Sequence, residues 1–400
     1  MNLMIKKSIL NGSISIPSSK SYSHRHLIMA LLSKGQFDIS NLNDGDDIEA
    51  TINVSKSLGC EVSKEKQVLH FDSTSLFAKT SDLMDVYASG STLRFFIPIC
   101  LTQKGTYRFY LRDRLKERSL KVYEDLLKDV RFKRDDHILE ISGKMTSGIY
   151  HVDGSHSSQF LSGLMMAFPL LEGDSELVIC PPFVSQDYFR MTLACMEHAG
   201  IEIEKVSELH YKVKGNQTYK YQPYVIESDA SAAVFIKVAK YLGLNIDCRM
   251  TTTHFQKDAM IDEFLESIQK GKRIFDVSDC PDLVPALSLA LALSKGSFEI
   301  IGAGRLKDKE SNRLEAIAHV LNTLGACITI TPTGLLIEGV ECLKGGQVDS
   351  YLDHRIAMMA VIAGLVSQED VILTNANCIS KSWPSFYTQI KEAGGRLYEL

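Results

Sequence analysis

The sequence predicts an α/β protein built from a repeated unit, and three observations indicate this class. Apolar segments of strand length alternate along the chain with longer helical segments. The same order of parts recurs roughly every 50 to 75 residues, which is the length of a two-helix α/β unit. Several helical segments, such as residues 286–293 and 357–366, are apolar almost all round. Such helices are usually buried on every side, so we expect inner helices covered by sheets and by more polar outer helices.

Each predicted repeat begins with small or acidic polar residues that open an apolar inner helix. A strand follows, and then a more polar outer helix that ends at glycine before the next strand. Glycine is typical of a helix end because the last carbonyl groups are satisfied there by a left-handed conformation. The six predicted openings are residues 18–25, 88–92, 153–159, 227–231, 279–282 and 351–355.

The elements follow from these openings in chain order. Predicted inner helices cover residues 27–32, 93–101, 160–168, 232–241, 283–294 and 356–365. Predicted outer helices cover residues 47–58, 120–127, 188–198, 258–268, 309–324 and 383–393. Predicted strands cover residues 13–16, 37–39, 106–111, 176–179, 297–301 and 370–373. With 400 residues, of which 45% are hydrophobic, the chain is long enough for two domains of three repeats each.

Composition excludes several classes of protein. The net charge of −5 argues against general nucleic-acid binding, which needs a basic surface. The nine cysteines contain no C-x-x-C pair, which argues against a zinc or redox motif and indicates a reducing compartment. Residues 1–10 lack the apolar core of a signal peptide, and the longest apolar run, 356–366, is too short to span a bilayer. We therefore expect a cytoplasmic monomer without nucleic-acid or membrane partners.

The first opening, residues 18–25, has the composition of an anion site. It follows a strand and places Lys20, Ser21 and Arg25 in the first turns of a helix, with Ser21 and Arg25 on one face. Unpaired N–H groups at a helix N-terminus attract anions, and hydroxyl groups and cations strengthen that attraction. The alternative is an ordinary serine-capped helix with two solvated cations, which is the commoner structure.

A second candidate lies in residues 304–313, directly after a predicted strand. Lys309, Glu310 and Arg313 have the spacing of one face at a helix start. The alternative is a solvated helix cap with internal ion pairs. Asp282 lies in the same repeat and could be a simple N-cap. Together with Glu310 it would form the carboxylate pair among cations that proton transfer between bound anions requires.

Other openings carry similar groups. Arg355 follows Asp353 at the entry of an apolar helix, where the alternative is a capping aspartate beside an exposed arginine. Ser157, Ser158 and Gln159 offer hydroxyl and amide donors at the third opening, and the same residues are also common caps. Arg94 lies just inside the helix of the second opening, and arginines 112, 114 and 118 cluster after the strand predicted over residues 106–111. The histidines 24, 156 and 354 lack metal-ligand spacing, so we expect no metal site.

Eight short motifs occur in a fixed order along the chain, and together they resemble the 5-enolpyruvylshikimate-3-phosphate synthases, also called 3-phosphoshikimate 1-carboxyvinyltransferases. The resemblance covers essentially the whole chain. The motifs are S-K-S-Y-S-H-R (19–25), S-G-S-T-L-R (89–94), R-L-K-E-R (114–118), D-G-S-H-S-S-Q-F (153–160), P-D-L (281–283), K-D-K-E-S-N-R-L (307–314), D-H-R-I-A-M (353–358) and S-K-S-W-P-S-F (380–386).

The resemblance implies a two-domain inside-out α/β barrel. Its six βαβαββ-like units would be arranged three per domain around buried inner helices. One domain would contain residues 1–17 and 227–400, and the other residues 18–226, with the active site in the cleft between them. The implied reaction transfers the enolpyruvyl group of phosphoenolpyruvate to the 5-hydroxyl of shikimate 3-phosphate and releases phosphate through a tetrahedral intermediate. It belongs to the shikimate pathway to chorismate and aromatic amino acids, is the target of glyphosate, and needs no metal or organic cofactor.

The resemblance also implies roles for individual residues. Asp282 would be the base for the 5-hydroxyl, Glu310 the proton relay to the methylene carbon, and Lys20 a cation shared between the substrates. Shikimate 3-phosphate would be bound mainly by residues of the second domain, and phosphoenolpyruvate by cations of both. The shikimate 3-phosphate set is Lys20, Ser21, Arg25, Ser157, Ser158, Gln159, Ser185, Tyr188, Asp282 and Lys309. The phosphoenolpyruvate set is Lys20, Gly90, Arg114, Gln159, Arg313, Arg355 and Lys381.

This chain departs from the family pattern at three positions. Ala88 and Arg305 stand where the family usually has asparagine, and Asn312 stands where it usually has aspartate.

Alternative functions remain open. The sister enolpyruvyl transferase acting on UDP-N-acetylglucosamine shares the implied fold but typically has a cysteine in the segment corresponding to residues 112–119, and this chain has none. A non-catalytic binder of phosphorylated metabolites, or a relative of RNA-processing proteins with similar repeats, would not need both Asp282 and Glu310.

Overall fold

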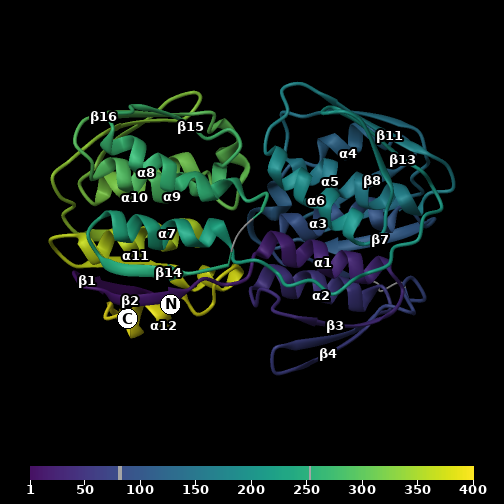
Figure 1. The fold of residues 1–400 in the computed structure, drawn as a ribbon, viewed down its shortest axis with the longest axis horizontal. Coiled ribbons are helices and arrows are strands. Elements are labelled where there is room, and N and C mark those ends of the chain that lie inside the picture. Colours follow the sequence, from purple (N-terminus) through teal and green to yellow (C-terminus); the bar gives the residue numbers. More distant parts are fainter. Residues whose placement is uncertain (80–82, 252–253) are drawn as a thin grey trace. The chain divides into compact units, whose positions relative to one another are not determined.

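A computed structural model describes residues 1–79, 83–251 and 254–400 of the chain. Two compact units are present. Residues 1–17 and 227–400 form unit 1, and residues 18–226 form unit 2. Figure 1 shows the two segments of unit 1 in purple and in teal-green to yellow, with unit 2 between them in the sequence.

Unit 2 is built around α1 (Lys20–Leu32), α3 (Gly90–Cys100) and α5 (Ser158–Ala167), which are buried along almost their whole length. The more exposed helices are α2 (Asp46–Ser57), α4 (Lys121–Leu126) and α6 (Gln186–His198). Its strands are β3 (Gln36–Ser40), β4 (Glu61–Glu65), β5 (Val68–Asp72), β6 (Met84–Asp85), β7 (Gly105–Tyr110), β8 (Arg131–Asp135), β9 (Ile138–Gly143), β10 (Ile149–Asp153), β11 (Ser175–Cys180), β12 (Ile203–Ser207) and β13 (His210–Val213).

Unit 1 is built in the same way around α7 (Ala230–Tyr241), α9 (Val284–Ala292) and α11 (His354–Val366), which pack against one another. The more polar helices are α8 (Ile261–Gln269), α10 (Arg313–Thr323) and α12 (Phe386–Glu392). Its strands are β1 (Leu3–Lys6), β2 (Asn11–Ser15), β14 (Asn245–Arg249), β15 (Ile274–Asp276), β16 (Ser297–Ile301), β17 (Cys327–Ile330), β18 (Leu335–Glu338), β19 (Gly346–Asp349), β20 (Val371–Thr374) and β21 (Arg396–Glu399).

Short 3₁₀ turns join several of these elements and carry residues of the predicted site. They are η1 (Asp113–Glu117), η2 (Phe168–Leu170), η3 (Lys257–Met260), η4 (Pro281–Leu283), η5 (Gly304–Asp308) and η6 (Ala376–Lys381). η4 leads directly into α9, and η5 ends just before the segment that precedes α10.

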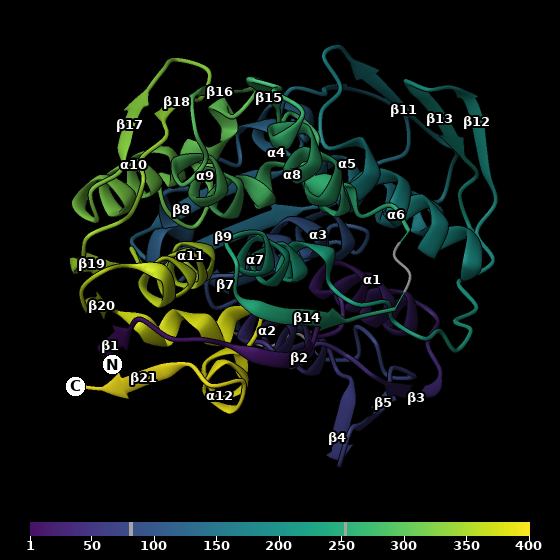
Figure 2. The same ribbon diagram turned by 60° about the vertical axis from the view of Figure 1, so that its left-hand side comes forward.

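The sheets repeat one pairing pattern. The orders β6–β7–β9–β8, β10–β11–β13–β12, β15–β16–β18–β17 and β19–β20–β1–β21 each combine one parallel pair with two antiparallel pairs. The remaining described sheets are β3–β5–β4 and β14–β2. Figure 2 shows β1 beside β21 at the chain ends, and β1 is antiparallel to both β20 and β21. The N-terminal strand therefore completes a sheet that the C-terminal segment begins, which explains why unit 1 is discontinuous.

The predicted inner helices agree with α1, α3, α5, α7, α9 and α11, and side-chain caps position most of their N-termini. Ser19, Ser89 and Ser157 accept hydrogen bonds from backbone N–H groups at the starts of α1, α3 and α5, and Asp229 and Asp353 do so for α7 and α11. Glycines with positive φ end the outer helices as predicted. Gly59, Gly200, Gly325 and Gly394 follow α2, α6, α10 and α12 with φ values of 108°, 78°, 96° and 103°.

Three predicted outer helices begin later than expected. The helix predicted from Lys309 begins at Arg313, because Ser311 and Asn312 favour a helix boundary over a helix interior. The helix predicted from Trp383 begins at Phe386, because the residue before Pro384 is restricted to extended conformations. The helix predicted over residues 258–268 divides into η3 and α8.

Within the described residues, no helix is both long and apolar enough to span a membrane. All nine cysteines are described and are free thiols.

Two buried histidines in α1 make unit 2 sensitive to acid. His24 and His26 are 1% and 2% exposed. Nε2 of His24 and Nδ1 of His26 have no hydrogen-bond partner within the described residues. Burial lowers the pKa of each to about 3, from an ordinary value of 6.5. Both rings are therefore neutral in the folded protein and become protonated more readily when the chain unfolds.

We predict that the stability of unit 2 falls as the pH drops below about 6.5, where the unfolded histidines begin to bind protons. At pH 5 each buried histidine should contribute about 2 kcal/mol to this loss. The measurement is urea unfolding between pH 7.5 and 5. His26→Gln should reduce the pH dependence, whereas His156→Gln, at an exposed position, should leave it unchanged. An equal pH dependence in wild type and His26→Gln would contradict the prediction.

Candidate active site

Asp282 is the centre of the polar cluster in unit 1. η4 places it immediately before the buried helix α9. Its Oδ1 accepts hydrogen bonds from Arg313 Nη1 at 2.6 Å and from Lys309 Nζ at 3.3 Å. Its Oδ2 accepts one from Arg355 Nη2 at 3.2 Å. One carboxylate is thus shared by three cations that come from two segments of the chain.

Arg313 connects this carboxylate to two others. Its side chain is 1% exposed. Nη2 donates to Glu310 Oε2 at 2.6 Å, and Nε donates to Asp353 Oδ2 at 2.7 Å. Asp353 is fully buried and also accepts from Ser311 Oγ at 3.1 Å. The planar guanidinium group presents its donors in several directions, which allows one arginine to hold three carboxylates.

The electrostatics of the cluster follow from these contacts. Burial by itself would raise the pKa of Asp282, but Arg355, Lys309 and Arg313 hold it well below its ordinary value. Burial would lower the pKa of Arg313, but Asp353, Glu310 and Asp282 raise it. Asp282 is therefore ionised at neutral pH, and Arg313 stays protonated.

Arg355 and Lys381 lie at the start of α11 and at the end of η6. Asp353 caps α11 by accepting from the backbone N–H of Arg355 at 3.0 Å, so it is both the predicted cap and a partner of Arg313. Arg355 is 6% exposed rather than solvated, and its Nη1 donates to the carbonyl group of Ser231 at 3.0 Å. Lys381, 9% exposed, donates to the carbonyl group of Leu352, just before Asp353.

In unit 2, the first turns of α1 hold the predicted cations in defined positions. Lys20 Nζ donates to Asp47 Oδ2 in α2 at 2.7 Å. Arg25 is 3% exposed and donates to Ser21 O and Tyr188 O, each at 2.8 Å, and to Thr192 Oγ1 at 2.7 Å. Arg25 therefore ties the start of α1 to the start of α6.

The predicted serines lie at the N-terminal ends of α5 and α6. Ser157 caps α5, and Ser158 is its first residue. Ser185 precedes α6 in a left-handed conformation, with a φ of 53°. The N–H of Val184 donates to the carbonyl group of Gly154 at 3.1 Å, which joins the loops before the two helices. The structure thus gathers hydroxyl groups and helix N-termini at one place in unit 2, an arrangement suited to an anion.

Gln159 in α5 and Gly90 in α3 each lie beside an arginine. Gln159 Oε1 accepts from Arg94 Nη1 at 2.7 Å, and its Nε2 donates to Ser91 Oγ at 2.8 Å. Gly90 lies against Arg118, because a Cβ atom built on Gly90 would be 2.5 Å from Arg118 Nη1.

Arg114, the arginine of this motif that was expected to bind phosphoenolpyruvate, has a side chain that is 42% exposed and pairs with Glu117 at 3.4 Å. Arg118 is the member of the R-L-K-E-R motif that the fold places against Gly90.

Several contributing residues were not assigned roles from the sequence. Asp47 and Ser231 had no distinguishing pattern, since acidic residues and serine are common in first helical turns. Asp353 was recognised as a cap, but its contact with Arg313 joins residues forty positions apart and has no local signal. Arg118 lies four residues after Arg114 in one motif, so the sequence does not distinguish them. The two differ in their place in the fold, because Arg114 lies within η1 and Arg118 directly follows it.

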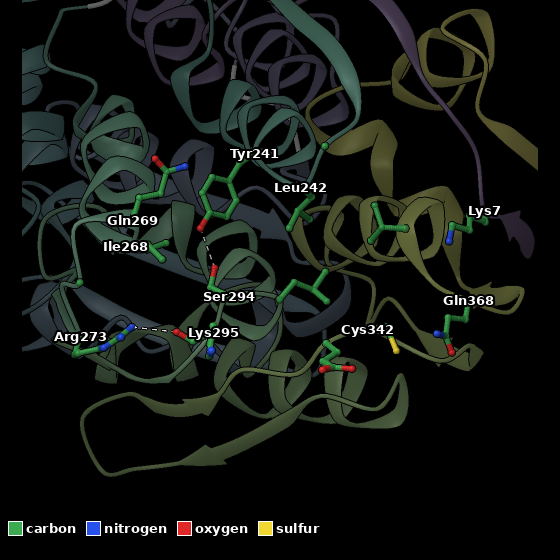
Figure 3. Close-up of a pocket in the computed structure, with 15 residues that line it drawn as sticks. Lys7, Tyr241, Leu242, Ile268, Gln269, Arg273, Ser294, Lys295, Cys342 and Gln368 are labelled. Atoms are coloured by element: carbon green, nitrogen blue, oxygen red, sulfur yellow. Dashed lines mark hydrogen bonds between the residues drawn. The ribbon is translucent and has the colours of Figure 1, made fainter.

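A hollow of about 850 Å³ in unit 1 lies away from these residues (Figure 3). Tyr241, Leu293 and Val366 line it at the C-terminal ends of α7, α9 and α11. Helix C-termini carry partial negative charge, so this end of the bundle is less favourable for anionic ligands than the opposite end. None of the predicted site residues lines the hollow.

The fold and the site define a class of protein before any comparison. Cations and hydroxyl groups at the N-terminal ends of buried helices suit phosphorylated, carboxylated substrates, and the paired carboxylates Asp282 and Glu310 suit proton transfer. Within the part of the chain that the structure describes, no group of three His, Cys, Asp or Glu residues is arranged to hold a metal ion. The helix N-termini and the carboxylate pair are the features expected of an enzyme that acts on phosphorylated, carboxylated substrates.

Comparison with known proteins identifies the family. The model of the EPSP synthase (3-phosphoshikimate 1-carboxyvinyltransferase) family matches residues 5–390. The 3-phosphoshikimate 1-carboxyvinyltransferase of Clostridium botulinum (strain Eklund 17B) is 40% identical, and the alignment covers 98% of this chain and 96% of the relative. The enzyme of the same name from Clostridium perfringens (strain 13) is 38% identical, with 99% of both chains covered. The chain therefore belongs to the EPSP synthase family, and its activity is that of a 3-phosphoshikimate 1-carboxyvinyltransferase in the shikimate pathway.

Solved structures agree on the fold. An EPSP synthase from Acinetobacter baumannii matches with a TM-score of 0.80 at 20% identity, over 100% of both chains. The enolpyruvyl transferase NikO from Streptomyces tendae matches with a TM-score of 0.77 at 13% identity, over 99% of this chain and 98% of that one. The α/β fold class expected from the repeats is confirmed.

We predict that Arg313→Met destabilises unit 1 by about 3–5 kcal/mol, because it leaves the buried charge of Asp353 without its main partner. The measurement is the free energy of unfolding by urea. Lys270→Met is the control, because the Lys270–Glu266 pair is largely exposed and should contribute less than about 1 kcal/mol. A loss for Arg313→Met no larger than that of the control would show that the ion cluster does not hold this part of the fold.

Proposed function

We propose that this chain transfers the enolpyruvyl group of phosphoenolpyruvate to the 5-hydroxyl of shikimate 3-phosphate and releases phosphate. The observation that carries the proposal is that three cations, Lys309, Arg313 and Arg355, share Asp282. Arg313 also pairs with the second carboxylate, Glu310. A substrate with a phosphate and a carboxylate group needs converging cations, and the transfer needs one carboxylate at the attacking hydroxyl and another at the methylene carbon.

Arg313, Arg355 and Lys381 are the proposed cations for phosphoenolpyruvate in unit 1. An anion that takes hydrogen bonds from Arg313 and Arg355 weakens their hold on Asp282. Its negative charge also raises the pKa of Asp282, which three cations otherwise hold low. Binding of phosphoenolpyruvate thus turns a weak base into a stronger one. The site becomes reactive only when its second substrate is present.

The residues of unit 2 are proposed to bind mainly shikimate 3-phosphate. Ser157, Ser158 and Ser185 supply hydroxyl groups at two helix N-termini, where N–H groups favour a phosphate. Ser21 and Tyr188 are fixed relative to each other by Arg25, which binds the carbonyl groups of both. Gln159 lies beside Arg94, and Lys20 beside Asp47.

The reaction proceeds by addition and elimination. Glu310 enters the reaction in its protonated form and Asp282 in its ionised form. Asp282 removes the proton of the 5-hydroxyl as its oxygen bonds to C2 of phosphoenolpyruvate, and Glu310 delivers its own proton to the methylene carbon C3. A tetrahedral intermediate with a methyl group results. Glu310 then takes a proton back from that methyl group, the C2–O bond to phosphate breaks, and phosphate leaves with the proton that Asp282 had accepted. Cations around the departing phosphate, including Lys20, stabilise the charge that develops on it.

We also propose the finer architecture that the repeats imply. Each unit is an inside-out α/β barrel of three βαβαββ-like repeats, with α1, α3 and α5, or α7, α9 and α11, as its buried inner helices. The shared strand pairing and the burial of these helices support this description. We propose further that the protein is a monomer and that it acts in the cytoplasm, a reducing compartment that agrees with the free thiols.

The proposed function predicts phosphate release when the protein is mixed with shikimate 3-phosphate and phosphoenolpyruvate. Asp282→Asn should lower kcat roughly 10²–10⁴-fold, because the amide cannot accept the hydroxyl proton. Initial rates of phosphate release measure both. Asp262→Asn is the control, because Asp262 is an exposed carboxylate of α8 that pairs with Lys237. Release from UDP-N-acetylglucosamine instead of shikimate 3-phosphate would overturn the substrate assignment, and near-normal turnover of Asp282→Asn would remove Asp282 as the base.

The structure separates two arginines of one motif. Arg118 lies against Gly90 at the start of α3, whereas Arg114 pairs with Glu117 at the surface. We infer from this position that Arg118, rather than Arg114, binds phosphoenolpyruvate. We predict that Arg118→Ala raises the KM for phosphoenolpyruvate at least about tenfold, as expected when a charge-assisted hydrogen bond to that substrate is lost. Arg114→Ala should change it less than about twofold. Steady-state kinetics with each substrate varied in turn make the measurement, and the reverse order of effects would restore Arg114 as the ligand.

A further inference from the structure

A buried aspartate outside the predicted site contacts a serine that itself contacts a residue of the site. Asp258, in η3, is 2% exposed. It accepts a hydrogen bond from the hydroxyl group of Ser231, in the first turn of α7. Burying a carboxylate is costly unless it is paired, so its presence needs a compensating interaction. The aspartate is not part of the substrate-binding sets described above.

Ser231 connects Asp258 to the catalytic cluster. The carbonyl group of Ser231 accepts from Arg355 Nη1 at 3.0 Å, and Arg355 Nη2 donates to Asp282 Oδ2 at 3.2 Å. Ser231 therefore links two contacts: its hydroxyl group binds Asp258, and its backbone carbonyl group binds Arg355, which in turn binds Asp282. The position of the Ser231 carbonyl group decides where the guanidinium group of Arg355 lies relative to Asp282.

The segment that contains Asp258 also holds the rest of the first turn of α7. Gln256 Oε1 accepts from the backbone N–H of Ala230 at 2.9 Å. Gln256 Nε2 donates to the carbonyl group of Ser228 at 2.9 Å. Asp258 adds the contact to the side chain of Ser231, so residues 256–258 fix the end of α7 that faces Arg355. This end lies next to η4, which carries Asp282, since η3 and α7 both contact η4.

The pKa of Asp258 also reflects its nearness to the residues of the predicted site. Burial raises the pKa of Asp258 to about 6, with a further contribution from the negative charge of Asp282, while Arg355 opposes the shift. Asp258 is thus close enough to Arg355 and Asp282 for their charges to interact.

We propose that Asp258 is a positioning residue for the reaction: through the Ser231 hydroxyl it fixes the carbonyl group that orients Arg355 beside Asp282. Asp258 does not touch substrate. Its effect is exerted on phosphoenolpyruvate binding, because Arg355 is a proposed ligand of that substrate. The inference rests in this respect on the proposed function.

Ser231→Ala and Asp258→Asn test the proposal from both ends of the hydrogen bond. Ser231→Ala removes the bond to Asp258 and should raise the KM for phosphoenolpyruvate about tenfold, because the carbonyl group that accepts from Arg355 is no longer held in position. Asp258→Asn keeps a hydrogen-bonding group of the same size and should have a smaller effect than Asp258→Ala. In each variant kcat and the KM for shikimate 3-phosphate should stay within about twofold of wild type. Steady-state kinetics with each substrate varied in turn supply these values.

Ser288→Ala is the matched control. Ser288 is a fully buried serine of the inner helix α9, and its hydroxyl group has no hydrogen-bond partner within the described residues. The control should leave both KM values unchanged. A Ser231→Ala variant with wild-type KM for phosphoenolpyruvate would overturn the proposal. So would a parallel rise of both KM values together with a lower unfolding midpoint, since that is the result of a purely structural role.

Arg355→Ala, measured in parallel, separates this inference from the proposed function. If Arg355→Ala raises the KM for phosphoenolpyruvate and Ser231→Ala does not, only the role of Asp258 fails. If Arg355→Ala also leaves that KM unchanged, the assignment of Arg355 as a ligand fails and the role of Asp258 falls with it. If Asp258→Ala does not fold, the comparison still stands. Ser231→Ala keeps the charge of Asp258, and Asp258→Asn keeps the shape of its side chain.

Discussion

The contact of buried Arg313 with Asp353, Asp282 and Glu310 is the interaction on which the arrangement of the polar cluster in unit 1 depends. A guanidinium group that is almost inaccessible to water must have its charge and its donors satisfied by the protein. The three carboxylates that satisfy it come from the cap of α11, the turn before α9 and the segment before α10. One side chain therefore fixes the relative positions of three elements and, with them, the residues proposed to bind and transform substrate.

The same principle operates throughout the proposed site. The predicted ligands are held by the protein's own groups: Lys20 by Asp47, Gln159 by Arg94, and Arg355 by Asp282 and the Ser231 carbonyl group. These partners keep the side chains ordered, so little conformational freedom has to be lost when substrate binds. In the proposed reaction, an arriving anion takes over part of these interactions. Asp282 then becomes more basic at the moment when the hydroxyl group to be deprotonated is present.

The repeat was predictable from the sequence because it depends on local patterns. The openings, the apolar inner helices and the glycine helix ends are each set by a few neighbouring residues, and α1, α3, α5, α7, α9 and α11 agree with them. The structure brings together the residues that were named from the 304–313 cluster, but their geometry differs from the predicted one. Lys309 and Arg313 were expected on one helical face, but Lys309 precedes α10 and meets Arg313 at Asp282 instead. Spacing along a helix could not reveal a partner 27 residues away.

The sequence by itself determined the fold class, the family resemblance and the list of chemically suitable residues, because these follow from periodicity, capping and short motifs. The tertiary structure decided which residues meet. It placed Arg118 rather than Arg114 against Gly90, made Asp353 a partner of Arg313 as well as a helix cap, and connected Asp258 to Arg355 through Ser231. These contacts join segments distant in sequence. Their distances depend on how buried helices and their caps pack, and no local pattern encodes that packing.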